Sequence, residues 1–359
     1  MVSTGASRQL RFGHWANRMT VTDTNVQAVN DIDPSASQST RRHSRLPSVL
    51  NKISLLLIWA GLIMLFGTLR PHTFLTLATL RTLSGDIAIT AVMAIAILLP
   101  LAANTFDLSI GGTMGLAVIV VTEFTVKAQF PLALAVLLTL VIGVAVGVAN
   151  AVIVSRFRVN SFITTLGTAS MLVATQQWIS GNVPITFGLP KVLTDLGTAT
   201  LFTIPLVFYC MVVIAVVVWY VLDFRQFGRF LYATGSNADA ARLAGVRTGR
   251  IVSSSLVLSA LIATIAGLLF VVRIGGASED AGTSYLLPAF AAAFLGATQF
   301  KEGNVNVPGT LLAVVTLATG VKGFQLMGAA FWVQQMFDGA ALILGVALAV
   351  RSGRQRVLG

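Results

Sequence analysis

Long apolar runs separated by short polar stretches dominate the pattern of this chain. An α-helix needs roughly 20 apolar residues to cross a hydrocarbon layer about 30 Å thick. Four runs reach or nearly reach that length without a charge: 53–69, 130–155, 202–222 and 251–272. Six further runs are shorter or contain polar groups: 87–103, 110–126, 161–179, 286–298, 308–327 and 329–350. Because backbone N–H groups inside a bilayer must be satisfied within their own segment, all ten runs are expected to be helices. The pattern predicts an all-α, polytopic integral membrane protein with about ten transmembrane helices.

Composition supports the same class. The chain has 359 residues, of which 55% are hydrophobic and 10% charged, with a mean hydropathy of +0.84. A soluble domain carries about 25% charged residues, so this chain cannot cover a water-facing surface with polar groups. The net charge of +11 does not indicate nucleic-acid binding, because the basic residues lie in short stretches between apolar runs and at the two ends.

Residues that could hold a metal or catalyse a reaction are scarce. Cys210 is the only cysteine, and His14, His43 and His72 are far apart in sequence. The chain contains no Walker A, G-x-G-x-x-G or H-E-x-x-H pattern. The sequence therefore predicts no cofactor, no metal site and no catalytic residue, which argues against an enzyme.

Lysine and arginine placement predicts the orientation. With ten crossings and a cytoplasmic N-terminus, 18 of the 24 Lys and Arg residues fall on the cytoplasmic side, as the positive-inside rule requires. The C-terminus is then cytoplasmic too. Residues 1–50 are predicted to be a disordered basic tail, because they are rich in Ser and Pro and poor in large apolar side chains. Residues 51–350 form the predicted transmembrane domain, and 351–359 form a second cytoplasmic tail.

One polar stretch, "GSNADAARLAGVRTGR" at 235–250, has the signals of a short capped helix. Asn237 is a good N-cap, and Asp239 places negative charge at the positive end of the helix dipole. Gly245 suits the left-handed position that follows a helix. A helix of about two turns is unstable alone in water, so it is expected to dock on a partner.

The residues around this stretch resemble the simple-sugar permeases of ABC importers, the ribose permease family. "FGRFLYATGSNADAARLAGVRTGRI" is similar to the family's cytoplasmic loop, and "DAARLAG" to the wider EAA motif, with Asp239 in place of Glu. Three other stretches, "LPLAANTFDLSIGG", "GVANAVIVSRFRVNSFITTLGTAS" and "AAAFLGATQFKEGNVNVPGTLLAV", resemble further family blocks in the same order. The likeness covers roughly residues 50–350.

The resemblance implies a bacterial inner-membrane protein with two related halves around a central path. It also implies three partners besides membrane lipid: a separate ATPase, an external solute-binding protein and a second permease copy or paralogue. The short helix becomes the coupling helix that seats in the ATPase. Its residues are Gly235, Asn237, Asp239, Ala240, Ala241, Leu243 and Gly245.

Polar groups inside membrane segments are costly and mark candidate solute-path residues. The candidates are Asn104, Thr105, Phe106, Asp107, Gln176, Lys322, Gln334 and Asp338. Asp107 either lines a helix break or caps the next helix. Lys322 either forms a buried pair with Asp338, extends to the interface, or contributes to the path. Gln176 is a candidate for the path or for docking.

Other functions remain open at this stage. A related permease for branched-chain amino acids or nucleosides fits the same features. An ion-coupled secondary carrier would need acids placed for ion or proton coupling, for which Asp107 and Asp338 are the candidates, and it would have no use for a docking helix.

Overall fold

The computed structural model describes residues 46–278, 280–301 and 303–357. Its contacts divide the chain into two units, Met1–Leu46 and Pro47–Gly359. Of the residues in the described helices, Leu46 belongs to the first unit and all others belong to the second. Residues 1–45 of the predicted basic tail lie outside the described residues. The last five residues of that predicted tail belong instead to the first described helix.

The described chain is helical apart from one small hairpin and the connections. The long helices are α2 (Leu46–Leu69), α4 (Leu77–Ala102), α5 (Ser109–Thr122), α6 (Leu132–Ser155), α7 (Ser161–Ser180), α9 (Leu206–Phe224), α12 (Thr248–Ile274), α13 (Ala281–Gly296), α14 (Val307–Leu326) and α15 (Phe331–Val357). The shorter elements are α3 (Pro71–Phe74), the π-helical turn η1 (Glu123–Lys127), α8 (Lys191–Thr198), β1 (Thr200–Leu201), β2 (Ile204–Pro205), α10 (Gln226–Ser236) and α11 (Ala238–Leu243).

Each of the ten predicted segments corresponds to one long helix, which confirms the all-α membrane class. Within the described residues, seven helices are long and apolar enough to cross a membrane: α4, α5 with η1, α6, α9, α12, α14 and α15. Residues 54–69 of α2 and the whole of α13 are apolar but shorter, and α7 carries more polar side chains. One segment starts later than predicted, because Phe202 and Thr203 form a left-handed turn (φ 48° and 74°) between β1 and β2.

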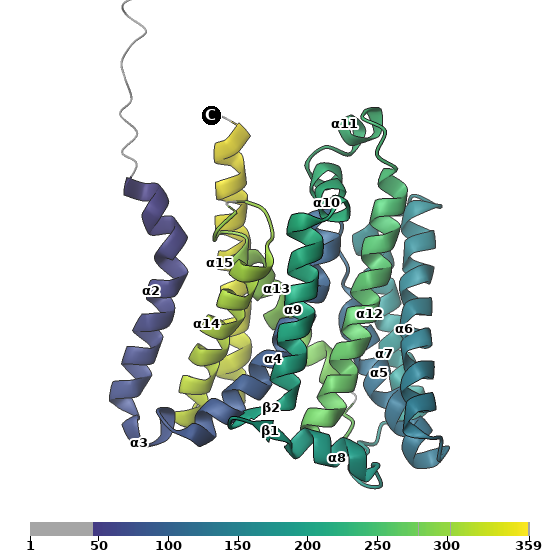
Figure 1. The fold of residues 1–359 in the computed structure, drawn as a ribbon, viewed down its shortest axis with the longest axis vertical. Coiled ribbons are helices and arrows are strands. Elements are labelled where there is room, and N and C mark those ends of the chain that lie inside the picture. The colour runs from purple at the N-terminus through teal and green to yellow at the C-terminus, as the bar shows by residue number, and fades with distance from the viewer. Residues whose placement is uncertain (1–45, 279, 302, 358–359) are drawn as a thin grey trace, which may run out of the picture. The chain divides into compact units, whose positions relative to one another are not determined.

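The two ends of the bundle differ. Figure 1 shows α11 at one end and α3, α8 and the β1–β2 hairpin at the other; we call these the α11 end and the α8 end. The last turns of α15 and the first turns of α2 both lie toward the α11 end, as an even number of crossings requires (Figure 1). On the outer helices, apolar side chains such as Leu137, Val213 and Ile343 are exposed, which suits contact with lipid.

Two polar connections interrupt the apolar helices. The first, residues 103–108, follows Pro100 near the end of α4 and holds Asn104 in the left-handed region (φ 53°). The second, 297–306, separates α13 from α14 and buries Val305 and Asn306, although the sequence pattern suggested an exposed cytoplasmic loop. Both connections lead into a helix with Gly-Thr in its first turns, at 112–113 in α5 and 309–310 in α14. This recurrence supports the prediction of two related halves.

Helix α5 is the centre of the bundle, because every residue from Ser109 to Thr122 is buried. Glycines bring its neighbours to backbone distance. A Cβ added at Gly282 of α13 would overlap the carbonyl oxygen of Gly111, and one added at Gly267 of α12 would lie 2.6 Å from that of Met114. Small residues at such crossings are how membrane helices gain packing energy without a hydrophobic driving force between them.

Asn306 organises the second connection, and its removal has a large expected effect on stability. Its Oδ1 accepts the N–H of Gly309 at 2.8 Å, while its amide group donates to the carbonyl oxygens of Gln299 (3.0 Å) and Asn304 (3.1 Å). We expect Asn306→Ala to lower the free energy of unfolding by about 2–3 kcal/mol, because it removes a cap and strands buried carbonyls. Thermal unfolding in detergent measures this.

Two variants control that measurement. Asn306→Asp keeps the cap acceptor and should lose less stability than Asn306→Ala, while Asn304→Ala, at an exposed neighbouring position, should melt like the wild type. Equal melting of Asn306→Ala and wild type would show that the cap does not hold the connection.

Candidate functional site

The stretch predicted to form a docking helix folds as α10, α11 and the start of α12. Asn237 is the N-cap of α11, and its Oδ1 accepts the N–H groups of Asp239 (3.1 Å) and Ala240 (2.9 Å). Gly245 follows in the left-handed region with φ 87°. The predicted cap and turn are therefore confirmed, whereas Gly235 lies in the last turn of α10 and not in the short helix.

Of the three apolar residues of α11 that the sequence singled out, Ala240 and Leu243 are exposed and one is buried. Ala241 is buried, whereas Leu243 is 91% exposed at the tip of the α11 end. An apolar side chain this exposed at the tip of a two-turn helix is suited to a pocket on a partner.

Helix α10 touches both polar connections. A Cβ at Gly235 would overlap the carbonyl oxygen of Ala102 and lie 3.0 Å from the N atom of Asn104, so α10 packs directly on the first connection. Tyr232 donates its hydroxyl to the carbonyl oxygen of Val305 (2.9 Å) in the second. Burial, with the nearby Asp223 carboxylate, raises the pKa of Tyr232, so the hydroxyl remains a donor at neutral pH.

Lys301 adds to the contact between α10 and the second connection. Its Nζ forms an ion pair with Asp223 at the end of α9 and lies 5.3 Å from the centre of the Tyr232 ring. Helix α10 thus contacts both connections and adjoins α11.

A cavity of about 650 Å³ lies between the two connections, and we call it the connection cavity. Asn104 and Phe106 line it from the first connection, and Asn304 from the second. Its other walls are mainly apolar, with aromatic rings from Phe162, Tyr232, Phe290 and Phe294. Two amides among aromatic faces can orient a small polar molecule and cover its apolar surface.

Asp107 anchors the start of α5. It is 1% exposed, and its Oδ1 accepts from the N–H (3.1 Å) and the hydroxyl (2.6 Å) of Ser109. The predicted break between the second and third segments is confirmed, but Asp107 does not line the connection cavity. Thr105, which is also buried, does not line the connection cavity either; it lines a separate cavity at the α11 end.

Side chains of α6 and α7 complete the anchoring of the first connection. Asn150 donates to the hydroxyl of Ser109 (2.8 Å), and Thr165 accepts the N–H of Leu108 (3.0 Å). Gln176 is buried and donates to the carbonyl oxygen of Gly112 (2.9 Å), so it joins α7 to α5 and lines neither this cavity nor the next one. Unpaired backbone groups at a helix break are thereby satisfied.

A second cavity, of about 310 Å³, lies among α4, α13, α14 and α15 and contains ionisable groups; we call it the charged cavity. Three sequence candidates meet here: Lys322, Gln334 and Asp338. A pair between Lys322 and Asp338, one of the alternatives for Lys322, is not among the ion pairs of the described residues. Lys322 pairs instead with Asp86 of α4 (3.7 Å), which Arg273 also approaches at 3.8 Å, because α4 places a carboxylate between the two cations.

Asp86 was missed because it lies just before an apolar run and its partners are far away in sequence.

We expect Asp86→Asn to lower the free energy of unfolding by about 1 kcal/mol. Loss of the carboxylate charge leaves two cations facing each other, and water at the half-exposed site limits their repulsion. The double variant Asp86→Asn with Lys322→Gln should regain much of the lost stability. Thermal unfolding of both variants measures this, with Asp195→Asn on the surface of α8 as a control. A single variant as stable as wild type would contradict the assignment.

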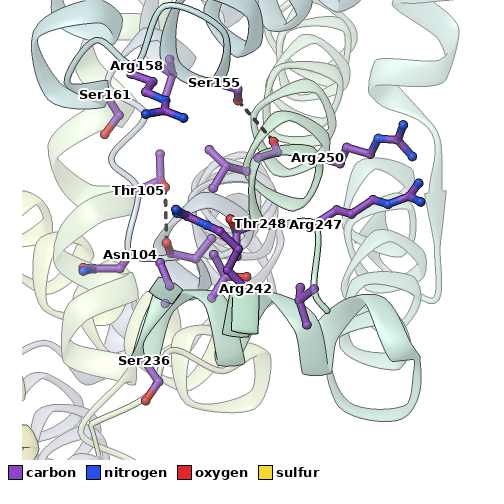
Figure 2. Close-up of a pocket in the computed structure, with 18 of the residues that line it drawn as sticks. Asn104, Thr105, Ser155, Arg158, Ser161, Ser236, Arg242, Arg247, Thr248 and Arg250 are labelled. Carbon is purple, nitrogen blue, oxygen red and sulfur yellow. Dashed lines mark hydrogen bonds between the residues drawn. The ribbon is translucent and has the colours of Figure 1, made fainter. Parts of the chain in front are cut away.

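A third cavity opens at the α11 end and is basic. Figure 2 shows Asn104 and Thr105 of the first connection together with arginines from the α6–α7 connection, α11 and the start of α12 around it. The sequence had treated these arginines only as topology signals. Within the described residues, no group of three His, Cys, Asp or Glu side chains could hold a metal ion.

A bundle of apolar helices with lipid-suited outer faces and buried polar connections defines a multi-pass membrane protein. Residues 79–346 match the family model described as branched-chain amino acid transport system / permease component, so the chain belongs to this permease family. It is a transport subunit and not an enzyme.

Three relatives of the chain are named as import permeases. The chain is 30% identical over 289 residues to the ribose import permease protein RbsC of Escherichia coli (strain K12), covering 79% of this chain and 89% of that protein. It is 28% identical over 289 residues to the autoinducer 2 import system permease protein LsrD of Photorhabdus laumondii, covering 79% and 86%. It is 30% identical over 296 residues to the fructose import permease protein FrcC of Rhizobium meliloti, covering 79% and 81%. No solved structure matches the chain.

Proposed function

We propose that this chain is the membrane-spanning permease of an ATP-binding-cassette importer for a monosaccharide or a related polyol. The observation that carries the proposal is the arrangement at the α11 end: α11 presents Leu243 outward, and the adjoining α10 contacts both polar connections. A motor that moves α11 would thereby alter the walls of the connection cavity. The import permeases named for ribose and fructose among the relatives support a sugar as the solute.

The partners follow from this role. A separate ATPase would bind the coupling helix at the α11 end, on the cytoplasmic side of a bacterial inner membrane. A solute-binding protein would deliver the solute at the α8 end. A second copy or a paralogue would complete the permease within the lipid bilayer.

The solute path of this proposal uses two cavities. The charged cavity lies toward the α8 end, where Gln325 and Gln334 share a hydrogen bond (3.1 Å) and Asp338 is 5% exposed. Carboxylate and amide groups are hydrogen-bond partners for sugar hydroxyls. The connection cavity, with its aromatic walls and two Asn side chains, would receive the solute next.

An ion-coupled carrier fits less well. Asp107 anchors α5 through its Oδ1 and lines neither the connection cavity nor the charged cavity, which leaves Asp338 as the one candidate coupling acid from the sequence that lines a cavity of the path. The exposed Leu243 would then have no role. A permease for branched-chain amino acids shares the architecture, but the named sugar importers favour polyhydroxylated solutes.

Reconstitution tests the proposal. The chain, the ATPase and the binding protein encoded beside it are placed in liposomes, and uptake of the solute held by the binding protein is measured. We expect accumulation that needs internal ATP and all three proteins. Accumulation by this chain alone, driven by a sodium or proton gradient, would overturn the proposal.

A further inference from the structure

The basic cavity at the α11 end has a volume of about 960 Å³ and lies between the α6–α7 connection, α10, α11 and the start of α12. Four arginines line it, Arg158, Arg242, Arg247 and Arg250, and none of the described residues that line it is acidic. Figure 2 shows Arg158 and Arg242 directed into the cavity from opposite sides, whereas Arg247 and Arg250 point away from it. Two guanidinium groups therefore face one space without a carboxylate between them.

Local charge does not neutralise this pair. Asp239 approaches Arg242 at 3.7 Å, but the side chains are 88% and 62% exposed, and water screens such a contact strongly. Arg158 has no ion pair among the described residues. Its backbone is in the left-handed region with φ 56°, which costs free energy for a residue with a side chain.

An orphan hydroxyl gives independent evidence of a ligand. Thr234 of α10 lines the cavity, is 4% exposed, and its Oγ1 has no hydrogen-bond partner among the described residues. Buried hydroxyls are nearly always paired with protein or water, so this one is available to a ligand in the cavity.

The start of α12 adds positive potential. Thr248 and Gly249 line the cavity at the N-terminus of this 27-residue helix. The N–H groups of Thr248 and Arg250 already donate to the carbonyl oxygens of Val246 and Arg247, so the helix contributes chiefly the partial positive charge of its N-terminus.

We propose that this cavity binds a phosphate group, either free or in the headgroup of an anionic phospholipid. A carboxylate could satisfy one guanidinium, whereas the several oxygens of a phosphate can accept from Arg158, Arg242 and Thr234 at once. The same cavity includes Asn104 and Thr105, so a bound phosphate joins the coupling helix to the first connection. Binding there regulates how far α11 can move.

Three variants separate this role from a structural one. Arg158→Gln with Arg242→Gln removes the two inward guanidinium groups. Arg247→Gln with Arg250→Gln removes two charges that point away, and is the matched control. Thr234→Val keeps the shape of the side chain and removes only a hydroxyl that has no partner, so folding should not suffer.

The test uses the purified full chain in a neutral detergent and measures the midpoint of thermal unfolding. The probes are short-chain phosphatidylglycerol, short-chain phosphatidylcholine, and inorganic phosphate against chloride at equal ionic strength. We expect phosphatidylglycerol, phosphate or both to stabilise the wild type and the control variant. The Arg158/Arg242 variant should lose most of that stabilisation, and Thr234→Val should need about tenfold more ligand.

The probes identify the source of the phosphate. Stabilisation by phosphatidylglycerol alone assigns a lipid headgroup, and equal stabilisation by inorganic phosphate assigns a free anion. The proposal is overturned if neither probe stabilises the wild type, or if both double variants respond equally. The test needs neither ATPase nor solute, so its failure would leave the import function untouched.

Discussion

Replacing Leu243 by Asp is expected to abolish solute-stimulated ATP hydrolysis while the chain still inserts and folds. Leu243 is 91% exposed, so folding loses little. An apolar side chain that fills a partner's pocket contributes about 2 kcal/mol or more to binding, and a charge in its place adds a desolvation cost. The loss corresponds to about thirtyfold or more in ATPase affinity. ATP hydrolysis and solute uptake in liposomes containing all three proteins measure the effect.

Conservative and buried variants control this result. Leu243→Met keeps an apolar side chain and should retain most of the activity. Ala241→Arg is a poorer probe, because Ala241 is buried and a large side chain there disrupts α11 itself. Full uptake by Leu243→Asp would show that α11 does not dock through this residue.

Gly282→Ala is expected to destabilise the protein severely and eliminate transport. In an isolated helix Ala is more favourable than Gly by about 1 kcal/mol, so local propensity favours the substitution. Packing opposes it, because the new Cβ would overlap the carbonyl oxygen of Gly111 and lie 2.7 Å from the N atom of Gly115. Both are backbone atoms of a helix that is buried throughout, so α5 cannot move away. Overpacking costs about 1–3 kcal/mol where side chains can adjust, and more is expected here.

Gly167→Ala in α7 is the matched control, since no heavy atom lies within 4 Å of an added Cβ there. The control should melt at or above the wild-type temperature, whereas Gly282→Ala should be lost on extraction or melt far lower. Thermal unfolding and uptake of the two variants decide the matter. Similar behaviour of both would mean that the α5–α13 contact is looser than the structure indicates.

Local patterns predicted much of the fold. Each apolar run became a long helix, and the capping signals at Asn237 and Gly245 were confirmed because they act within a few residues. The exact start of α9 was missed. Phe202 and Thr203 were included in the predicted apolar segment, although they form the turn of a hairpin.

Interactions between distant residues were harder to predict. No local pattern indicated that Lys322 would meet Asp86 and not Asp338, because helix neighbours depend on the whole topology. The contact of Tyr232 with Val305 and the inward direction of Arg158 have no local pattern either. A charge just before an apolar run, as at Asp86, is the kind of signal that could have prompted a search for a partner.

The complete enclosure of α5 has a consequence for biogenesis. Helix α5 leaves the ribosome long before α12 and α13, the later helices whose glycines approach its backbone. Until those helices are synthesised, the face of α5 at Gly111 and Met114 lacks its later neighbours, although α7 already covers Gly112 and Gly115. The two halves therefore mature together, and a chain truncated before α12 would expose α5 to membrane quality control.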